Sequence, residues 1–154
     1  MELRLETPID APADAAWQLL GPEFAQIDRW SSFVRTSRPI DRSEVPAGTM
    51  VAPTAPVPGR ETTTKATLIE VLTAYSDDER TLTFEGVGLP PVVSYAGNTQ
   101  SIVETGPNSS AVVFEVRMDF KGPFKLLGPV MKRRMQKTFG AVQADLARHA
   151  AATV

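Results

Sequence analysis

Apolar and polar residues alternate along several segments of the first 120 residues, and this period of two is typical of β-strands. Residues 2–9 place Leu3, Leu5 and Ile9 on one face and charged side chains on the other, which predicts a half-buried strand. Residues 111–120 alternate in the same way. Both segments therefore predict strands with one face against a core and one face toward solvent.

Two predicted hairpins lie between these segments. Residues 62–75 are rich in Thr, Val, Ile and Leu and predict one strand, which a short polar turn connects to a second strand at residues 81–85. Residues 92–105 and 111–120 flank another short turn. Parallel neighbours would need helical crossovers for which this stretch has no room, so we expect one antiparallel sheet of six or seven strands.

Short helices are predicted directly after the first strand. Pro12 suits the first helical position, and Gly21 ends the helix after Leu20. A second brief apolar turn covers residues 24–27. Residues 39–59 carry five prolines, which predict irregular loop with short edge strands only.

Beyond residue 123 the apolar period changes to about 3.6, which predicts one long amphipathic helix. Its apolar stripe consists of Leu127, Met131, Met135, Phe139, Val142 and Leu146. Such a stripe has to pack against another element, and the predicted sheet is the available partner. The residues before this helix are too few to form two cores, so residues 1–154 are expected to form a single α+β domain.

Composition excludes several classes of protein. Hydrophobic residues make up 42% of the 154 residues and charged residues 22%, which indicates a globular chain. The chain has no cysteine, so thiol nucleophiles, disulfides and Cys-ligated metals are excluded. His149 is the only histidine, and no carboxylate cluster has ligand spacing, so we expect no metal, no other cofactor and no Ser-His-Asp triad. The charged N-terminal residues and the absence of a long apolar run favour a cytoplasmic protein with no integral membrane segment.

Positive charge is concentrated at the C-terminus. Residues 120–154 hold seven basic residues and one acidic residue, a net charge of +6, which leaves −8 for residues 1–119. The run Lys132-Arg133-Arg134 could attract a nucleic acid or an anionic membrane surface, or could be a solvated helix face. No aromatic residues interleave these bases, so we do not expect a nucleic-acid partner.

Several segments resemble the START-like SRPBCC superfamily, especially its polyketide cyclase/dehydrase branch. They are residues 9–17 at the first helix, Trp30, residues 70–75 with 80–84, and residues 120–123 with 127–129 at the start of the last helix. The resemblance implies a helix-grip fold, in which a curved antiparallel sheet wraps around the long C-terminal helix. It also implies a cavity between them for lipids, polyketides or other apolar molecules. A curved sheet and a straight helix leave a gap between them, and ligand pockets of this kind measure roughly 300–1000 Å³.

Candidate ligand-binding residues follow from this arrangement. The predicted apolar walls are Leu68, Leu72, Phe84, Phe114, Val116, Met118, Met131, Met135 and Phe139, all of which could equally be ordinary core. Trp30 could cover one end of the cavity, or could staple the short helices to the sheet. Tyr95, Asn98 and Gln100 could supply polar contacts, and the sequence leaves open which of them point inward.

Two residues are candidates for chemistry. Strict alternation in residues 62–75 would place Glu70 on the face of Leu68 and Leu72, where it could act as a general base. Glu70 could instead face water or pair with a cation. Arg60 could stabilise an enolate oxygen or a ligand carboxylate, or could be a solvated loop residue.

These observations support three hypotheses. The first is a protein that binds or transports a small hydrophobic molecule in the cavity. The second is a polyketide cyclase or dehydratase that positions a poly-ketone chain and uses Glu70 and Arg60. The third is a regulatory domain that binds a partner through the basic helix face. The chain is expected to be a monomer or a homodimer.

Overall fold

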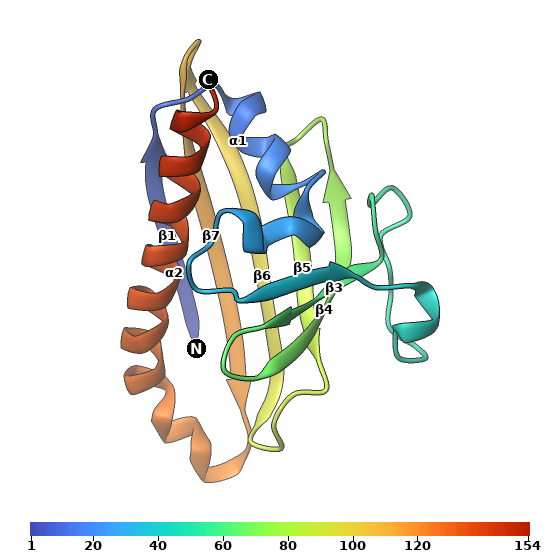
Figure 1. The fold of residues 1–154 in the computed structure, drawn as a ribbon. Helices are drawn as coiled ribbons and strands as arrows, with labels where there is room; N and C mark the ends of the chain where they lie inside the picture. Colours follow the sequence, from blue (N-terminus) through green and yellow to red (C-terminus); the bar gives the residue numbers. More distant parts are fainter.

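A single antiparallel sheet of seven strands dominates the computed structural model, which describes residues 1–154 (Figure 1). The strands are β1 (Glu2–Ile9), β2 (Thr36–Pro39), β3 (Gly59–Thr63), β4 (Thr67–Ser76), β5 (Thr81–Val87), β6 (Val93–Gly106) and β7 (Ser109–Phe120). Their spatial order is β1-β7-β6-β5-β4-β3-β2, so every neighbouring pair except β1 and β7 is consecutive in the chain. The predicted antiparallel sheet is confirmed.

Helices lie on one face of this sheet. The short helices α1 (Ala13–Leu20) and η1 (Phe24–Arg29) follow β1, and η2 (Arg42–Glu44) lies in the proline-rich loop. The segment η3 (Gly122–Leu127) leads into the long helix α2 (Gly128–Ala152), which runs beside β1 (Figure 1). The sheet curves around α1 and α2, which is the helix-grip arrangement and confirms the predicted α+β fold. No helix is both long and apolar enough to cross a membrane.

The strand predicted over residues 62–75 is in fact two strands. β3 ends at Thr63, the chain turns at residues 64–66, and β4 begins at Thr67. The two strands pair with Arg60 opposite Glu70. The prediction of one strand was wrong because Thr occurs in tight turns as well as in strands, so the Thr-rich segment gave no turn signal of its own.

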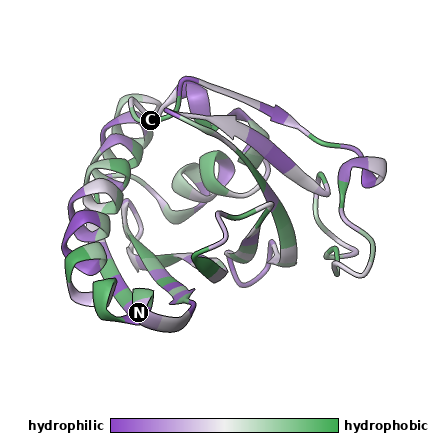
Figure 2. Ribbon diagram, turned by 90° about the horizontal axis from the view of Figure 1, so that it is seen from below, coloured by the Kyte–Doolittle hydropathy of each residue, from purple (hydrophilic) through white to green (hydrophobic).

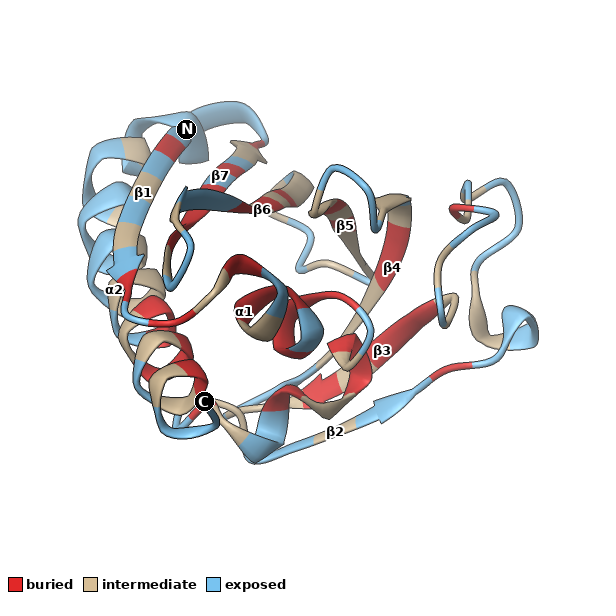
Figure 3. Cartoon of the chain, turned by 90° about the horizontal axis from the view of Figure 1, so that it is seen from above, coloured by how far each residue is buried: buried red, intermediate tan, exposed pale blue.

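Helix α1 lies inside the curve of the sheet, as the view from above shows (Figure 3). Its inward face is almost completely buried and joins a core that includes Leu72, Leu82 and Phe114. Trp17 fixes the helix to the β4–β5 turn, because its indole Nε1 donates a hydrogen bond of 2.9 Å to Asp77. Tyr75 donates to the same carboxylate at 2.8 Å, and burial and that carboxylate raise the pKa of Tyr75 well above its usual range.

Helix α2 is attached to the rest of the protein through its C-terminal half. Gln143 is fully buried, donates to the carbonyl of Leu5 at 3.0 Å and accepts from the Thr7 hydroxyl at 2.8 Å. Asp145 accepts hydrogen bonds from the backbone N–H and the hydroxyl of Ser32 at 2.9 and 2.7 Å. These polar contacts fix the rotation of the helix against β1 and the segment after η1.

The N-terminal half of α2 is different. Every buried residue of α2 lies between Val142 and Ala150, and η3 has none. Leu127 is 45% exposed, and Met131, Met135 and Phe139 are only partly buried. The prediction that the apolar stripe packs on the sheet is therefore confirmed for Val142 and Leu146, which are buried, and in part for Met135 and Phe139, which pack against the edge of the core. The space inside the sheet is filled at the α1 end and left partly open at the other.

Two glycine substitutions are expected to change stability in opposite directions. A Cβ at Gly59 would overlap the carbonyl oxygen of Glu70 and lie 3.0 Å from the Cα of Val71, so Gly59→Ala should push β3 from β4. We expect this to lower the free energy of unfolding by about 1–3 kcal/mol. Gly140 lies inside α2 with nothing within 4 Å of such a Cβ, so Gly140→Ala should raise it by about 0.5–1 kcal/mol. Urea unfolding measures both, and equal effects would contradict the close approach of β3 and β4.

Candidate functional site

A row of inward-facing side chains crosses the concave face of the sheet. Cross-strand pairing places Arg60 opposite Glu70, Phe84 opposite Asn98, and Asn98 opposite Val116. Since side chains on one face recur every second residue, all five share the face that contacts the helices. The row thus combines an ion pair, an aromatic ring, an amide and an aliphatic side chain.

A cavity of about 200 Å³ lies between this row and the N-terminal half of α2. It lies at the end of the sheet where β5 ends and β6 begins. Its lining is mostly apolar and comprises Leu68, Glu70, Phe84, Gly86, Ala96, Gly97, Asn98, Val116, Arg117, Met118, Met135 and Phe139. The cavity is smaller than the expected volume of roughly 300–1000 Å³.

Asn98 is the unusual member of the lining. The residue is only 3% exposed, and neither its Nδ2 donor nor its Oδ1 acceptor has a hydrogen-bond partner. Buried amides are almost always paired, and an unpaired one costs about 1–3 kcal/mol. The amide therefore offers both a donor and an acceptor to a molecule inside the cavity.

Glu70 and Arg60 form the most buried ion pair of the protein. Arg60 Nε lies 2.9 Å from Glu70 Oε1, and the two side chains are only 5% and 13% exposed. Every other ion pair has at least one side chain more than a quarter exposed. Glu70 therefore faces inward and also pairs with a cation, so it combines features of both interpretations of this residue.

Arg60 is fixed from three sides. Its Nη1 donates to the carbonyl of Phe24 at 2.9 Å. Its guanidinium carbon lies 3.8 Å from the centre of the Phe24 ring and 5.0 Å from that of Phe84. The guanidinium is thus held between aromatic faces, an arrangement that favours a buried cation. Arg60 is not a solvated loop residue, and it lies behind Glu70 instead of lining the cavity.

Other predicted site residues lie outside the cavity. Leu72 and Phe114 are fully buried in the core, where Phe114 packs edge-on against Phe139 at 6.1 Å. Met131 does not line the cavity, since it lies one turn before Met135 where α2 has left the sheet. Gln100 points inward and is buried, but toward the α1 end. These residues are core or helix surface.

Trp30 also lies outside the cavity lining. It ends η1 and packs against the core, with its Nε1 buried and without a hydrogen-bond partner. The interpretation that it staples the short helices to the sheet fits this position better than a cavity lid.

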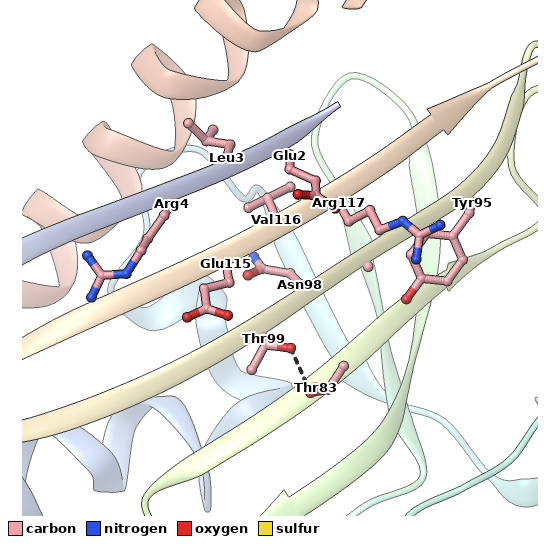
Figure 4. Close-up of a pocket in the computed structure, with 11 residues that line it drawn as sticks. Glu2, Leu3, Arg4, Thr83, Tyr95, Asn98, Thr99, Glu115, Val116 and Arg117 are labelled. Carbon is pink, nitrogen blue, oxygen red and sulfur yellow. Dashed lines mark hydrogen bonds between the residues drawn. The ribbon is translucent and has the colours of Figure 1, made fainter.

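Tyr95 faces the other way. It donates a hydrogen bond of 3.1 Å to Glu85 on the convex face, and the Arg117 guanidinium lies 5.1 Å from the centre of its ring (Figure 4). Burial, with Glu85 beside it, raises the pKa of Tyr95. The structure therefore does not place Tyr95 in the cavity, because an odd number of positions separates it from Asn98 and the two side chains lie on opposite faces of β6.

A second hollow, an open groove of about 470 Å³, crosses the convex face around Tyr95 (Figure 4). Its polar side chains include groups that are already paired: Thr83 with Thr99 at 2.9 Å, and Arg117 with the neighbouring Asp119 at 2.8 Å. The groove is larger than the inner cavity and also borders Asn98. The strand register, however, puts the Asn98 side chain on the concave face, together with Phe84 and Val116. The inner cavity is the better candidate site.

Sequence reasoning missed the small residues of the lining. Gly86 and Ala96 lie two residues from Phe84 and Asn98 on the same strands and line the cavity, and the Leu89 side chain lies against Gly86. Glycine has no side chain and so adds nothing to the alternation of apolar and polar residues. Only the strand register shows that Gly86 lies on the cavity wall.

Comparison with known proteins identifies the family. Residues 2–151 match the family model described as "Polyketide cyclase / dehydrase and lipid transport", so the chain belongs to this family. The resemblance to the polyketide cyclase/dehydrase branch is confirmed. A search of curated protein sequences found no significant match.

Solved structures with the same fold have different described roles. A START superfamily protein from Mycobacterium smegmatis superimposes with a TM-score of 0.77 at 13% identity over 99% of both chains. The di-domain ARO/CYC BexL from the BE-7585A biosynthetic pathway gives a TM-score of 0.75 at 15% identity, over 96% of this chain and 45% of BexL. Norcoclaurine synthase from Thalictrum gives 0.72 at 15% identity, over 99% of this chain and 95% of the synthase. Identities this low show the shared fold alone.

Removal of one charge of the Arg60–Glu70 pair should destabilise the protein more than removal of both charges. Arg60→Ala leaves the Glu70 carboxylate buried without its cation and should lower the free energy of unfolding by about 3–5 kcal/mol. The double variant Arg60→Met/Glu70→Leu removes both charges and should recover most of this loss. Chemical denaturation of the three proteins measures the coupling. A loss below about 0.5 kcal/mol for Arg60→Ala, which is typical of an exposed pair, would show that the pair is not buried in solution.

Proposed function

We propose that this protein binds a small, mainly apolar molecule that carries one hydrogen-bonding group, in the cavity between the sheet and α2. The observation that carries the proposal is the unpaired, buried amide of Asn98 on the wall of an apolar cavity. Membership of a family described by polyketide cyclisation and lipid transport supports a ligand of this character.

The polar side chain of Asn98 indicates that the cavity is a binding site and not a poorly packed region of the core. A core position with apolar neighbours is ordinarily filled by Leu or Val, which have no polar atoms to satisfy. An amide at this position destabilises the empty protein and is useful only if something pairs with it. A ligand hydroxyl, carbonyl or N–H group directed at Asn98 would supply that pairing, while Met118, Met135 and Phe139 contact its apolar part. Methionine side chains adapt to guests of different shape.

Replacement of Asn98 is expected to increase stability and decrease binding. Asn98→Leu removes two unpaired polar atoms and should raise the free energy of unfolding by about 1–3 kcal/mol. The same change should weaken binding of N-phenyl-1-naphthylamine, a neutral fluorescent probe with a single N–H group, by about tenfold. Binding of 1-benzylnaphthalene, which has a similar shape without the N–H, should change little when it is measured by competition.

Two tryptophan substitutions on β6 provide the control. Ala96→Trp fills the cavity and should abolish probe binding. Val103→Trp places the same bulk on the exposed convex face of the strand and should leave binding intact. If both variants bind the probe like the original protein, the probe does not occupy this cavity and the proposal fails.

The position of Glu70 supports a second candidate function, an enzyme of the cyclase or dehydratase type. Glu70 lines the cavity, Arg60 holds its Oε1, and no hydrogen bond engages its Oε2. Oε2 can accept a proton from a CH₂ group between two carbonyls of a poly-β-ketone. The resulting enolate carbon then bonds to a second carbonyl carbon of the folded chain, whose oxygen takes up the proton, and loss of water completes a dehydration. Arg60 acts on this chemistry through Glu70, as a positioning residue.

This second candidate makes a separate prediction. Glu70→Gln keeps the shape of the side chain but removes the base, so turnover of a linear poly-β-ketone thioester should fall by about 100-fold or more. Binding of the naphthylamine probe should stay within a few-fold. Glu115→Gln, an exposed carboxylate on the convex face, serves as the control. Product formation followed by mass spectrometry at an unchanged rate in Glu70→Gln would exclude Glu70 as the base.

A further inference from the structure

The segment that leads into α2 exposes large apolar side chains next to one another. Phe124, Leu126, Leu127 and Val130 are 42%, 83%, 45% and 60% exposed. We call these four residues the entry surface. They are half of the exposed large hydrophobic residues of the protein, although they lie within seven consecutive positions. Such clustering marks an interaction site, whereas scattered apolar residues do not.

Exposed basic residues flank the entry surface along the chain. Between residues 120 and 144 the chain has six basic residues and no acidic one: Lys121, Lys125, Lys132, Arg133, Arg134 and Lys137. None of the six takes part in an ion pair, although most arginines elsewhere do. A partner that fits this surface therefore needs an apolar region for the four hydrophobic side chains and anionic groups next to it for the basic side chains.

The entry surface lies at the same end of the sheet as the cavity. The backbone N–H of Lys121 donates to the carbonyl of Val92 at 2.9 Å, so η3 adjoins the β5–β6 loop. Met118 and Met135, on either side of η3 along the chain, both line the cavity. Figure 1 shows η3 at one extremity of the molecule, and Figure 2 views the molecule from this end, with hydrophobic and hydrophilic segments interleaved along α2.

We propose that the entry surface docks the protein onto an anionic lipid bilayer, with the cavity end toward the membrane. The apolar side chains enter the boundary between headgroups and acyl chains, and the basic residues contact anionic headgroups. Weak insertion and electrostatic attraction together give reversible binding that neither provides alone. The inference goes beyond ligand binding and does not depend on it.

Two other partners, a second copy of the chain and a single-stranded nucleic acid, fit this surface less well. A symmetric dimer through the entry surface would bring two clusters of six positive charges face to face. A single-stranded nucleic acid would require several aromatic platforms, and Phe124 is the only aromatic residue of the surface. An anionic bilayer satisfies both the apolar and the basic side chains.

The test is flotation of the protein with vesicles. Vesicles of two parts phosphatidylcholine to one part anionic phosphatidylglycerol should carry the protein at low salt, and pure phosphatidylcholine should not. Binding should fall at least tenfold between about 50 and about 500 mM salt. Leu126→Glu/Val130→Glu should reduce binding at least tenfold, as should the triple replacement of Lys132, Arg133 and Arg134 by Gln.

Matched controls alter the same residue types elsewhere. Met50→Glu changes an exposed apolar residue of the proline-rich loop, and the triple replacement of Arg35, Arg42 and Lys65 by Gln removes three exposed cations. Both should leave flotation unchanged. Equal losses in control and test variants, or no flotation at all, would overturn the proposal. So would a dimer in analytical ultracentrifugation that Leu126→Glu dissociates, in a protein that does not float.

Discussion

The packing of α1 into the curve of the sheet is the constraint on which the other features depend. Because α1 and the residues around Trp17 pack inside the curve of the sheet, the buried residues of α2 are confined to its C-terminal half, and Met135 and Phe139 reach only the edge of the core. Gln143 and Asp145 then fix that half by hydrogen bonds. The remaining half of α2 spans space that no other element fills, and this is where both the cavity and the exposed apolar segment arise.

Within that space, polar groups occupy positions where apolar ones would stabilise the fold more. The sheet row that runs from Arg60 to Val116 could be apolar throughout. It instead carries a buried ion pair and an unpaired amide, both of which need partners that hydrophobic residues do not. Arg60 is satisfied within the protein, by Glu70 and by the carbonyl of Phe24. The amide of Asn98 has no partner in the protein. Arg60 is therefore a polar group with a structural role, whereas Asn98 is free to bind a ligand.

The sequence predicted the architecture well and the site in part. Alternation in residues 111–120 and the stripe at Val142 and Leu146 are strong signals, because burial of one face enforces them. The face of Glu70 depended on the strand register, which the turn at residues 64–66 sets and the Thr-rich segment concealed. In β6 both faces are mixed, so only the pairing with β5 and β7 shows that Asn98 points inward and Tyr95 outward. The cavity itself depends on where α2 leaves the sheet, and no local pattern encodes that point.

At Gly97 the wall of the cavity is a single strand backbone, because this residue borders both the inner cavity and the convex groove. The Tyr95 phenol lies where the missing side chain would be and braces the strand from outside. Asn98, Val116 and Arg117 border both hollows as well, but of these residues only Gly97 has no side chain. Any residue other than glycine at position 97 would therefore displace the Tyr95 phenol, because its Cβ would overlap the phenol oxygen.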